Sequence, residues 1–260
     1  ISDPLYGNVK IFHSRNKIVK YFAKRYEKKY LAFTNALVVM NDEIKKFYEV
    51  TFGLKNVSVI EQGIDDELIT KIVDCHKLIT THDHQLAEER FVIVYGGMFY
   101  EKLREPFELY KAVETSEIPI KLKLFGKIKD KFLPVNSTKI EYYGRVSQEC
   151  LFNEYSRADC LVFLDNAFGI QVPGKACELL FFNKPVLFIS SNKNSPSLKY
   201  FRNYDQLVIL ENDSAKINFW FQKRLISRNK GFDHSTKVEE FYWKNLILKY
   251  LPIINEENGP

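Results

Sequence analysis

The chain has 260 residues, of which 45% are hydrophobic and 27% charged, and its formal net charge at pH 7 is +5. This length and apolar fraction are enough for one large or two small domains with a real core, and they exclude an intrinsically disordered chain. The mildly basic balance fits an anionic ligand or an acidic membrane surface, although many proteins carry as much charge without either partner. No apolar run approaches the ~18 residues that span a bilayer, and the first residues do not resemble a secretory signal peptide.

The cysteines indicate a reducing compartment. Cys75, Cys150, Cys160 and Cys177 show no CxxC spacing. Two of them fall inside apolar strand and helix patterns, where free cysteine behaves as a small hydrophobe. We therefore expect four reduced thiols in a cytosolic protein.

The N-terminal segment combines an unusual start with a basic helix pattern. The first ten residues, ISDPLYGNVK, lack an initiator Met, which suggests that an earlier part of the chain is missing. Residues 9–32 have helical periodicity, with an apolar side that is expected to pack against the protein. That side carries Ile11, Ile18, Phe22, Tyr26 and Tyr30, and the opposite side carries Arg15, Lys17, Lys20, Lys24, Lys28 and Lys29. A solvated basic face is the favoured interpretation, and contact with anionic lipid is the alternative.

A short alternation of strand and helix follows. Residues 36–40 (ALVVM) and 57–60 (VSVI) are predicted strands, and Asn41 or Asp42 is the expected N-cap of the helix between them. The chain then turns at Gly63. Residues 74–90 are polar and weakly patterned, which favours a linker. Their His82-Asp83-His84 sequence could bind a metal, but in a polar linker we interpret it as solvated surface.

From residue 91 the pattern becomes a regular β-α alternation. Strands joined to helices by short loops predict a parallel, doubly wound sheet whose ligand site lies at the carboxyl ends of its strands. The predicted strands are FVIVYG, IKLKLFG, KIEYYG, CLVFLD, VLFIS and LVILE, and the predicted helices are FELYKAVE, SQECLFNEYSRA with Ser147 as N-cap, and ACELLFF. Residues 236–251 are expected to form an amphipathic terminal helix.

Glycines and cations gather at the predicted strand ends. Glycine after a buried strand lets the backbone turn sharply and approach a ligand closely. The strand-end positions are Gly96-Gly97, Gly126, Gly144-Arg145-Val146 and the loop 166–175, with Lys102, Arg104 and Lys175 nearby. This set indicates a phosphate-bearing ligand. No GxxxxGK[ST] and no GxGxxG after a strand occurs, which argues against a P-loop kinase and a nicotinamide or flavin enzyme.

Residues 165–190, DNAFGIQVPGKACELLFFNKPVLFIS, carry the most specific pattern. Pro173-Gly174-Lys175 opens onto the apolar stretch ACELLFF, which Asn183-Lys184-Pro185 should end. Backbone N–H groups at such a start favour anions, and Lys175 adds a positive charge. Glu178, one turn on, is suited to accept hydrogen bonds from sugar or ribose hydroxyls. A polar cap on an ordinary strand–helix–strand unit is the alternative.

Taken in order, several segments resemble the retaining, two-Rossmann-domain (GT-B) glycosyltransferases of family four, the group 1 family. The segments are ALVVMNDEIKKFY, VSVIEQGIDDELI, FVIVYGGMFYEKLREPFELYKAV, KIEYYGRVSQECLFNEYSRADCLVFLD and GIQVPGKACELLFFNKPVLFI. The resemblance covers most of residues 20–255. It implies a doubly wound α/β fold with an incomplete N-terminal domain. Residues 1–88 would be the end of the acceptor-side domain with a linker, 89–230 the donor-binding domain, and 231–260 a C-terminal helix packing back across both.

The resemblance also implies residue roles. Lys102 matches the lysine that meets the donor diphosphate, with Arg104 as a second cation. Arg145 and Val146 match the place where the backbone meets the base, and Glu178 matches the glutamate that accepts the ribose hydroxyls. The backbone from Val172 through Gly174 to Lys175 would face the phosphates, and Gly96, Gly97 and Gly126 complete the expected donor site. The catalytic residues cannot be named, because the family's acceptor pocket would precede residue 1.

Two positions depart from the family pattern. Gly97 stands where members often have arginine, and Ile170 stands where the first glutamate of the E–x7–E pattern is expected. Either the donor sugar is held by backbone groups or catalysis is weakened.

The sequence therefore predicts a cytoplasmic glycosyltransferase, of hexosyltransferase type and peripheral on the inner face of the plasma membrane. It would use a UDP- or GDP-sugar, retain configuration, and need no metal or other cofactor. Its expected acceptor is a glycan or lipid-linked molecule of polysaccharide biosynthesis, and no nucleic acid is expected. A nucleotide-sugar 2-epimerase of the same architecture and a non-catalytic nucleotide-sugar-binding module are the alternatives.

Overall fold

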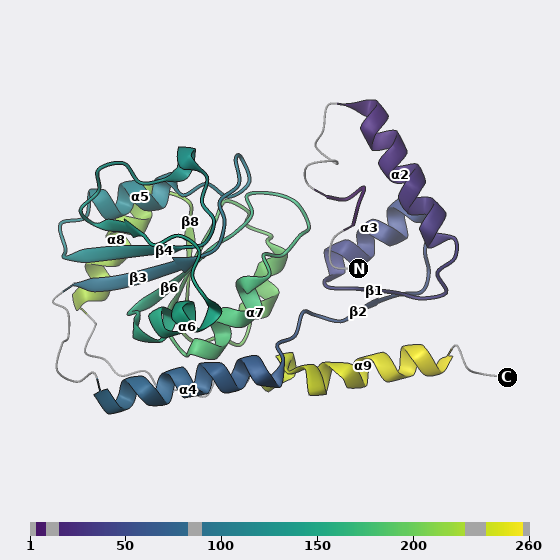
Figure 1. The fold of residues 1–260 in the computed structure, drawn as a ribbon. Helices are drawn as coiled ribbons and strands as arrows, with labels where there is room; N and C mark the ends of the chain where they lie inside the picture. Colours follow the sequence, from purple (N-terminus) through teal and green to yellow (C-terminus); the bar gives the residue numbers. More distant parts are fainter. Residues whose placement is uncertain (1–3, 9–15, 83–89, 227–237, 257–260) are drawn as a thin grey trace.

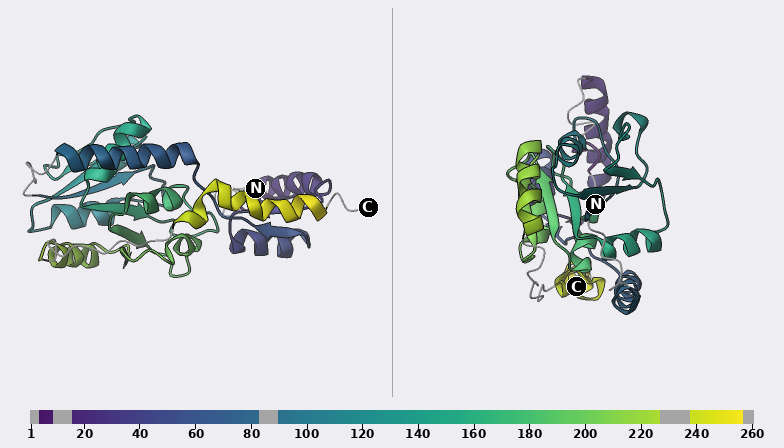
Figure 2. Two further views of the ribbon diagram at one scale, coloured as in Figure 1. Left: turned by 90° about the horizontal axis from the view of Figure 1, so that it is seen from below. Right: turned by 90° about the vertical axis from the view of Figure 1, so that its left-hand side faces the viewer.

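The computed structural model describes residues 4–8, 16–82, 90–226 and 238–256. Within these ranges the chain forms a larger unit around a six-stranded sheet and a smaller unit around a two-stranded sheet (Figure 1). Helix α4 (Asp66–His82) runs along the larger unit, and helix α9 (Trp243–Glu256) runs along the smaller one (Figure 2). The molecule is therefore elongated, with the two sheets side by side.

The larger sheet is parallel, and its strands lie in the order β5-β4-β3-β6-β7-β8. They are β3 (Phe91–Gly96), β4 (Ile120–Phe125), β5 (Ile140–Tyr142), β6 (Cys160–Leu164), β7 (Val186–Ser190) and β8 (Leu207–Glu211). Counted along the chain from β3, the order is 3-2-1-4-5-6, that of the dinucleotide-binding doubly wound fold. The predicted fold class and its six strands are confirmed. The direction of winding reverses between β3 and β6.

Helices cover both faces of this sheet, because its central strands β6 and β7 are apolar on both sides. One face packs against α5 (Phe107–Glu114) and α8 (Ser214–Ile226), and the other against α6 (Gln148–Arg157) and α7 (Lys175–Leu179), with α4 packed on α6. All five residues of β6, and likewise of β7, are buried. Fully burying each large side chain contributes roughly 1.5–3 kcal/mol. The central strands that carry the site are therefore rigidly held.

Polar caps begin and end the helices where the sequence predicts. The Asn41 side chain accepts from the Ile44 N–H at the start of α3 (Asp42–Phe52), and the Ser147 hydroxyl accepts from the Cys150 N–H at the start of α6. After α7 the chain tightens into a 3-10 turn (Leu180–Phe182), and Asn183, with φ of 50°, ends it. The predicted helix ACELLFF is thus a short α-helix followed by a 3-10 turn.

The smaller unit consists of α2 (Lys17–Leu31), α3 and a parallel pair, β1 (Leu37–Val39) with β2 (Val57–Val59). Its core is a compact cluster in which Ile44 and Tyr48 are fully buried. Within this cluster the Glu27 carboxylate accepts from the Tyr48 hydroxyl and from the Leu5 and Tyr6 N–H groups. One buried carboxylate therefore fixes α2 on α3.

The apolar side of α2 does not pack against the protein, and this expectation was wrong. Ile18, Phe22 and Tyr26 are 67%, 60% and 56% exposed. The buried stripe is instead Ala23, Glu27 and Leu31, because small residues allow close approach and Glu27 finds three donors inside. Ile11 and Arg15 lie outside the described residues.

Other sequence expectations also need correction. Residues 74–82, expected in a linker, continue α4, because the packed face of Leu68, Ile69 and Ile72 already fixes this helix against the larger unit. The described part of the terminal helix begins at Trp243, after a 3-10 turn (Glu239–Phe241), and runs to Glu256. Helix α8 was not anticipated. The His82-Asp83-His84 site lies outside the side chains that the structure describes.

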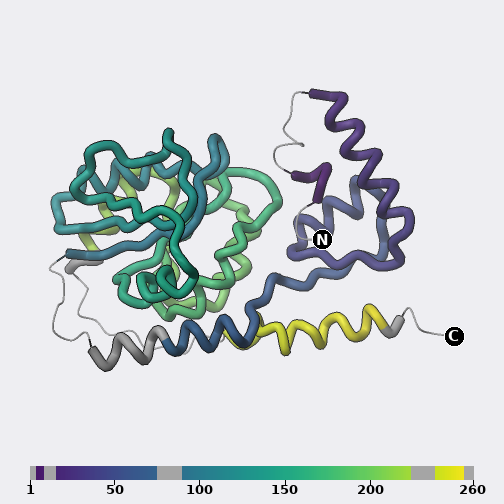
Figure 3. Tube along the Cα trace, viewed as in Figure 1, coloured from purple at the N-terminus to yellow at the C-terminus, as the bar shows by residue number. Residues whose placement is uncertain are grey.

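The chain passes between the two units twice, before α4 and before α9 (Figure 3). The two passages are hydrogen-bonded to each other: the Ile64 N–H donates to the Phe241 carbonyl at 2.9 Å, and the Trp243 N–H to the Ile64 carbonyl at 3.1 Å. Across the units, Lys199 pairs with Asp42 at 2.8 Å and the Gln62 N–H donates to the Tyr200 hydroxyl at 3.0 Å. These contacts set the smaller unit beside the carboxyl edge of the larger sheet.

Candidate functional site

A cavity of about 700 Å³ opens at the carboxyl ends of β3 and β6, where the direction of winding reverses. In doubly wound sheets this reversal leaves a crevice, because neighbouring helices depart on opposite faces. The cavity is lined by Gln62, Tyr95, Gly96, Gly97, Met98, Tyr100, Arg104, Phe125, Gly126, Lys127, Arg145, Val146, Leu151, Val162, Phe163, Leu164, Pro173, Gly174, Lys175, Glu178 and Leu179. Its lining thus comes from the loops after β3, β4, β5 and β6, and from the passage between the units.

The floor of the cavity is backbone, and its glycines are required sterically. Gly126 has a φ of 122°, and a Cβ there would lie 2.2 Å from the Gly97 carbonyl oxygen. A Cβ at Gly96 would lie 2.1 Å from the Tyr155 hydroxyl. The loops after β3 and β4 can therefore pass this closely only without side chains.

The charge of the lining is strongly positive. Four cationic side chains, Arg104, Lys127, Arg145 and Lys175, face a single carboxylate, Glu178, which gives a formal excess of +3 (four minus one). The described residues include no group of three or more His, Cys, Asp or Glu placed to hold a metal ion. This surplus of donors at a rigid backbone floor suits an anion with several oxygens.

Lys175 and Glu178 form an ion pair inside the cavity. The ammonium lies 2.9 Å from Glu178 Oε2 and 5.9 Å from the centre of the Tyr155 ring. Only 14% of the Glu178 side chain is exposed, against 35% for Lys175. The pair can separate when a ligand offers hydroxyl donors to the Glu178 carboxylate and an anion to the Lys175 ammonium.

Arg104 is held toward the loop after β6. Its Nη2 and Nε donate to Asn166 Oδ1 at 2.7 and 3.3 Å, and its guanidinium stands 5.6 Å from the Tyr100 ring centre. Burial raises the pKa of the neighbouring Tyr95 hydroxyl, and the charge of Arg104 offsets part of that rise. The neutral hydroxyl donates to the Met98 carbonyl at 3.1 Å, so it braces the turn that leads to Arg104.

Most of the residues selected from the sequence lie together here. Nine of them line the cavity: Gly96, Gly97, Arg104, Gly126, Arg145, Val146, Gly174, Lys175 and Glu178. The other two do not. Lys102 is exposed in a left-handed turn, where its N–H donates to Glu105, and Val172 packs against the core.

The departure at Ile170 has a structural explanation. Its side chain packs against the hydrophobic cluster of the smaller unit, and its carbonyl accepts from the Asn41 amide at 2.9 Å. An apolar residue at this position therefore attaches the loop 166–174 to the smaller unit. At Gly97, a Cβ would meet the Tyr95 hydroxyl at 2.9 Å, which leaves no room for a larger side chain without a shift of that ring.

Sequence reasoning missed four polar lining residues, Gln62, Tyr95, Tyr100 and Lys127. Lys127 follows directly after Gly126, so the same strand-end signal that selected the glycine could have found it. Tyr95, Tyr100 and Gln62 gave no comparable signal. Gln62 enters the cavity only because the passage between the units crosses the strand ends.

The described residues contain no helix long and apolar enough to cross a membrane. No protein-family model matches the chain, and no curated protein matches its sequence.

Three solved structures that share this architecture are HepE, sucrose-phosphate synthase and WaaG. HepE of Anabaena in complex with UDP has a TM-score of 0.66 at 11% identity, covering 98% of this chain and 71% of that one. Sucrose-phosphate synthase from Thermosynechococcus elongatus has a TM-score of 0.62 at 14% identity, covering 94% and 64%. WaaG, a glycosyltransferase involved in lipopolysaccharide biosynthesis, has a TM-score of 0.58 at 12% identity, covering 84% and 62%.

The chain thus spans roughly two thirds of the length of these structures, from 62% to 71%. At such low identity the likeness concerns the fold. The larger sheet, the reversal between β3 and β6 and the smaller unit beside the strand ends together give the chain the GT-B, Rossmann-like fold of these glycosyltransferases.

Proposed function

We propose that the chain is the donor-binding part of a retaining glycosyltransferase of the family-four type. It would transfer a hexose from a UDP- or GDP-sugar to a glycan or lipid-linked acceptor in polysaccharide biosynthesis. The observation that carries this proposal is the cavity at the β3–β6 reversal, with four cations and one carboxylate over a backbone floor. HepE, a structural neighbour, has been solved with UDP and with UDP-glucose, which supports a donor of this class.

The chemistry follows from the charge. When the glycosidic bond to the diphosphate breaks, negative charge builds up on the leaving phosphate. Arg104, Lys127 and Lys175 would stabilise that charge in a site already ordered for it, as fixed donors do for other developing anions. In this proposal these cations take the part that a divalent metal plays elsewhere. Glu178 would accept hydrogen bonds from the ribose hydroxyls, and Arg145 with Val146 would lie beside the base. The attacking oxygen would belong to the acceptor.

The domain roles follow the same division. The smaller unit within residues 1–88 would belong to the acceptor side, whereas α4 packs on the larger unit. Residues 89–230 would bind the donor, and residues 231–260 would tie the two units together. The two hydrogen bonds between Ile64 and the segment before α9 support this division, because they join both passages at one point.

A thermal-shift screen of UDP-, GDP- and ADP-sugars tests the donor assignment. A ligand at one hundred times its Kd stabilises a fold by ~2.7 kcal/mol, which for a chain of this size raises the melting temperature by roughly 5–10 °C. We expect a UDP- or GDP-sugar to give this shift and the free sugar to give none. A flat response to all three nucleotide classes would contradict the proposal.

A non-catalytic donor-binding module is the second candidate, and Ile170 favours it. This residue offers no polar side-chain group to a donor sugar, and it is engaged by the smaller unit. Product analysis separates the possibilities. The favoured glycosyltransferase needs an acceptor for turnover, a 2-epimerase converts the donor alone, and a binding module binds without either reaction.

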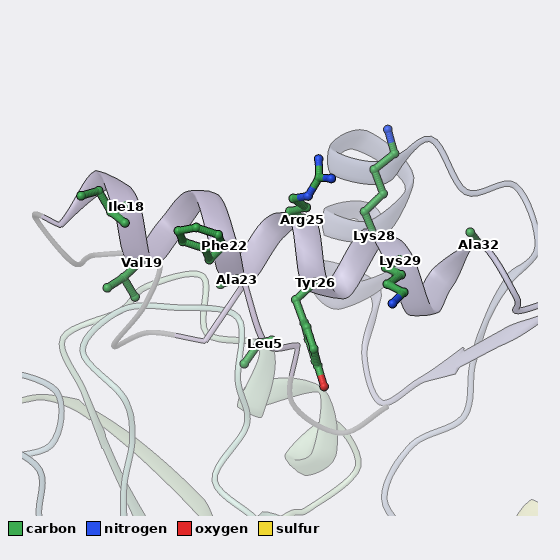
Figure 4. A pocket seen from close by; sticks show the side chains of 10 residues that line it. All are labelled: Leu5, Ile18, Val19, Phe22, Ala23, Arg25, Tyr26, Lys28, Lys29 and Ala32. Carbon is green, nitrogen blue, oxygen red and sulfur yellow. The ribbon is translucent and has the colours of Figure 1, made fainter.

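We further propose that the protein acts at the cytoplasmic face of a membrane, with α2 on the lipid surface. A groove of about 950 Å³ runs along α2 (Figure 4) and is lined by Leu5, Ile18, Val19, Phe22, Ala23, Arg25, Tyr26, Lys28, Lys29 and Ala32. It thus combines exposed aliphatic and aromatic side chains with three cations and no acidic group. An interfacial helix on anionic lipid has this combination, because its apolar side chains enter the headgroup region while its cations meet the phosphates.

Vesicle flotation tests this surface. The protein should float with vesicles containing phosphatidylglycerol and remain unbound with phosphatidylcholine alone. The double variant Ile18→Ser/Phe22→Ser should abolish flotation, whereas Val50→Ser, at a 77%-exposed site on α3, should not. Equal flotation of both variants, or none by the wild type, would remove α2 as a membrane surface.

A further inference from the structure

Asn166 is a buried polar residue in contact with the cavity residue Arg104. It follows β6, and only 6% of it is exposed. A buried amide is costly unless its groups are hydrogen-bonded, because it gives up its contacts with water. Both ends of the Asn166 amide are satisfied, and one of them by the cavity residue Arg104.

The contacts define how the amide points. Its Oδ1 accepts two N–H groups of Arg104, from Nη2 at 2.7 Å and from Nε at 3.3 Å. Its Nδ2 donates to the Gln171 carbonyl at 2.9 Å. A guanidinium can only donate and a carbonyl can only accept, so the opposite orientation of the amide would break these bonds. Asn166 therefore joins Arg104 to Gln171, farther along the loop 166–174 to which Asn166 itself belongs.

The residues on either side of Asn166 are held by hydrogen bonds of their own. The preceding residue, Asp165, is buried and accepts from the Ser190 hydroxyl at 2.7 Å and the Ser197 hydroxyl at 2.8 Å. On the other side, the Ala167 N–H donates to the Leu103 carbonyl at 2.7 Å, which joins the loop to the turn bearing Arg104. The backbone on both sides of Asn166 is thus held independently of its side chain.

We propose that Asn166 is a positioning residue that aims the Arg104 guanidinium at the anionic part of the ligand and leaves its charge uncompensated. An amide oxygen accepts the same two N–H groups as a carboxylate would, but it carries no charge. Arg104 is therefore oriented while its full positive charge remains available to a phosphate. This inference rests on the proposed function only in naming that phosphate as part of a nucleotide-sugar diphosphate.

The test is calorimetric titration of wild type, Asn166→Ala and Asn166→Asp with inorganic pyrophosphate, a nucleoside diphosphate and the matching nucleoside. Asn166→Asp supplies a carboxylate that neutralises Arg104, and Asn166→Ala removes the acceptor. Both should lower affinity for the two diphosphates by about tenfold, the scale of one hydrogen bond to a charged group. Affinity for the nucleoside should change less than twofold. Asn203→Asp makes the same charge change on an exposed side chain before β8, at the opposite edge of the sheet, and should leave all three affinities unchanged.

A double-mutant cycle distinguishes positioning from a general structural role. In an Arg104→Gln background, Asn166→Ala should change pyrophosphate affinity less than twofold, because its effect acts through the arginine. Additive losses, or an equal loss for the nucleoside, would overturn the proposal. If the wild-type protein binds pyrophosphate but no nucleoside diphosphate, the proposed donor is wrong. The pyrophosphate affinities of the Asn166 variants then still test whether Asn166 positions Arg104. Wild-type protein that binds neither would overturn both.

Discussion

Replacing Gly126 by Ala tests whether the cavity floor has the backbone geometry described. The new Cβ would lie 2.2 Å from the Gly97 carbonyl oxygen, whereas ordinary contact begins at 3.4 Å. The two loops would have to separate by about 1.2 Å, the difference of these distances. Two hydrogen bonds of 2.8 Å resist that movement, from the Gly97 N–H to the Phe125 carbonyl and from the Gly126 N–H to the Gly144 carbonyl.

The expected cost has two parts. A left-handed backbone costs an alanine roughly 1–2 kcal/mol, and an overpacked contact costs roughly 1–3 kcal/mol more. The free energy of unfolding should fall by about 2–5 kcal/mol, and the melting temperature by roughly 4–20 °C. Nucleotide affinity should also fall, because Gly97 and Gly126 both line the cavity.

Gly144→Ala is the matched control. Gly144 also has a positive φ, 73°, but a Cβ there meets nothing within 4 Å. It should therefore show only the backbone cost. Urea unfolding of the two variants measures the difference directly. If Gly126→Ala is no less stable than Gly144→Ala, the close approach of the two loops is wrong.

Three further predictions concern titratable groups. Burial alone raises the pKa of Glu61, but its own backbone N–H, Lys249 and Lys199 outweigh burial and lower it below the ordinary 4.5. Its contribution to stability is therefore present above that value and lost as the pH falls through the lower folded-state pKa. In urea unfolding measured from pH 3 to 7, Glu61→Gln should reduce the fall of the midpoint toward acid pH. The same fall in wild type and variant would refute a stabilising role for the Glu61 carboxylate. Burial, with the charge of Glu178, raises the pKa of Cys177 to about 12, so iodoacetamide at pH 8 should label exposed Cys150 long before Cys177, and equal labelling in peptide mass spectrometry would contradict this. Glu178→Ala should lower the affinity for a nucleoside diphosphate by about tenfold, but the affinity for its 2′,3′-dideoxy form by less than twofold. An equal loss of affinity for both would mean that Glu178 does not contact the ribose hydroxyls and serves only to pair with Lys175.

The sequence was sufficient for the fold of the larger unit because local signals agree with tertiary structure there. Apolar strands such as Cys160–Leu164 are buried on both faces, and caps such as Ser147 begin the helices where expected. Parallel strands bring their carboxyl ends together, so glycines distant in sequence, such as Gly96 and Gly126, were placed in one site.

The wrong expectations concern features that tertiary contacts determine, such as which face of a helix is buried and which side chains enter the cavity. The buried face of α2 is set by three donors converging on Glu27, which helical periodicity cannot reveal. Lys102 and Arg104 are only two residues apart, and the left-handed turn at Lys102 determines which of them enters the cavity. Gln62 lines the site only through the packing of the two units.

The most direct test of the central claim is calorimetric titration of the wild-type protein with a nucleoside diphosphate, its monophosphate and its nucleoside, at low and high salt. A cavity with a +3 excess should bind the diphosphate most tightly and the nucleoside most weakly. The diphosphate should lose the most affinity as salt screens the cations. A nucleoside that binds as tightly as its diphosphate, or a diphosphate affinity that salt leaves unchanged, would contradict a phosphate-binding site at the β3–β6 reversal.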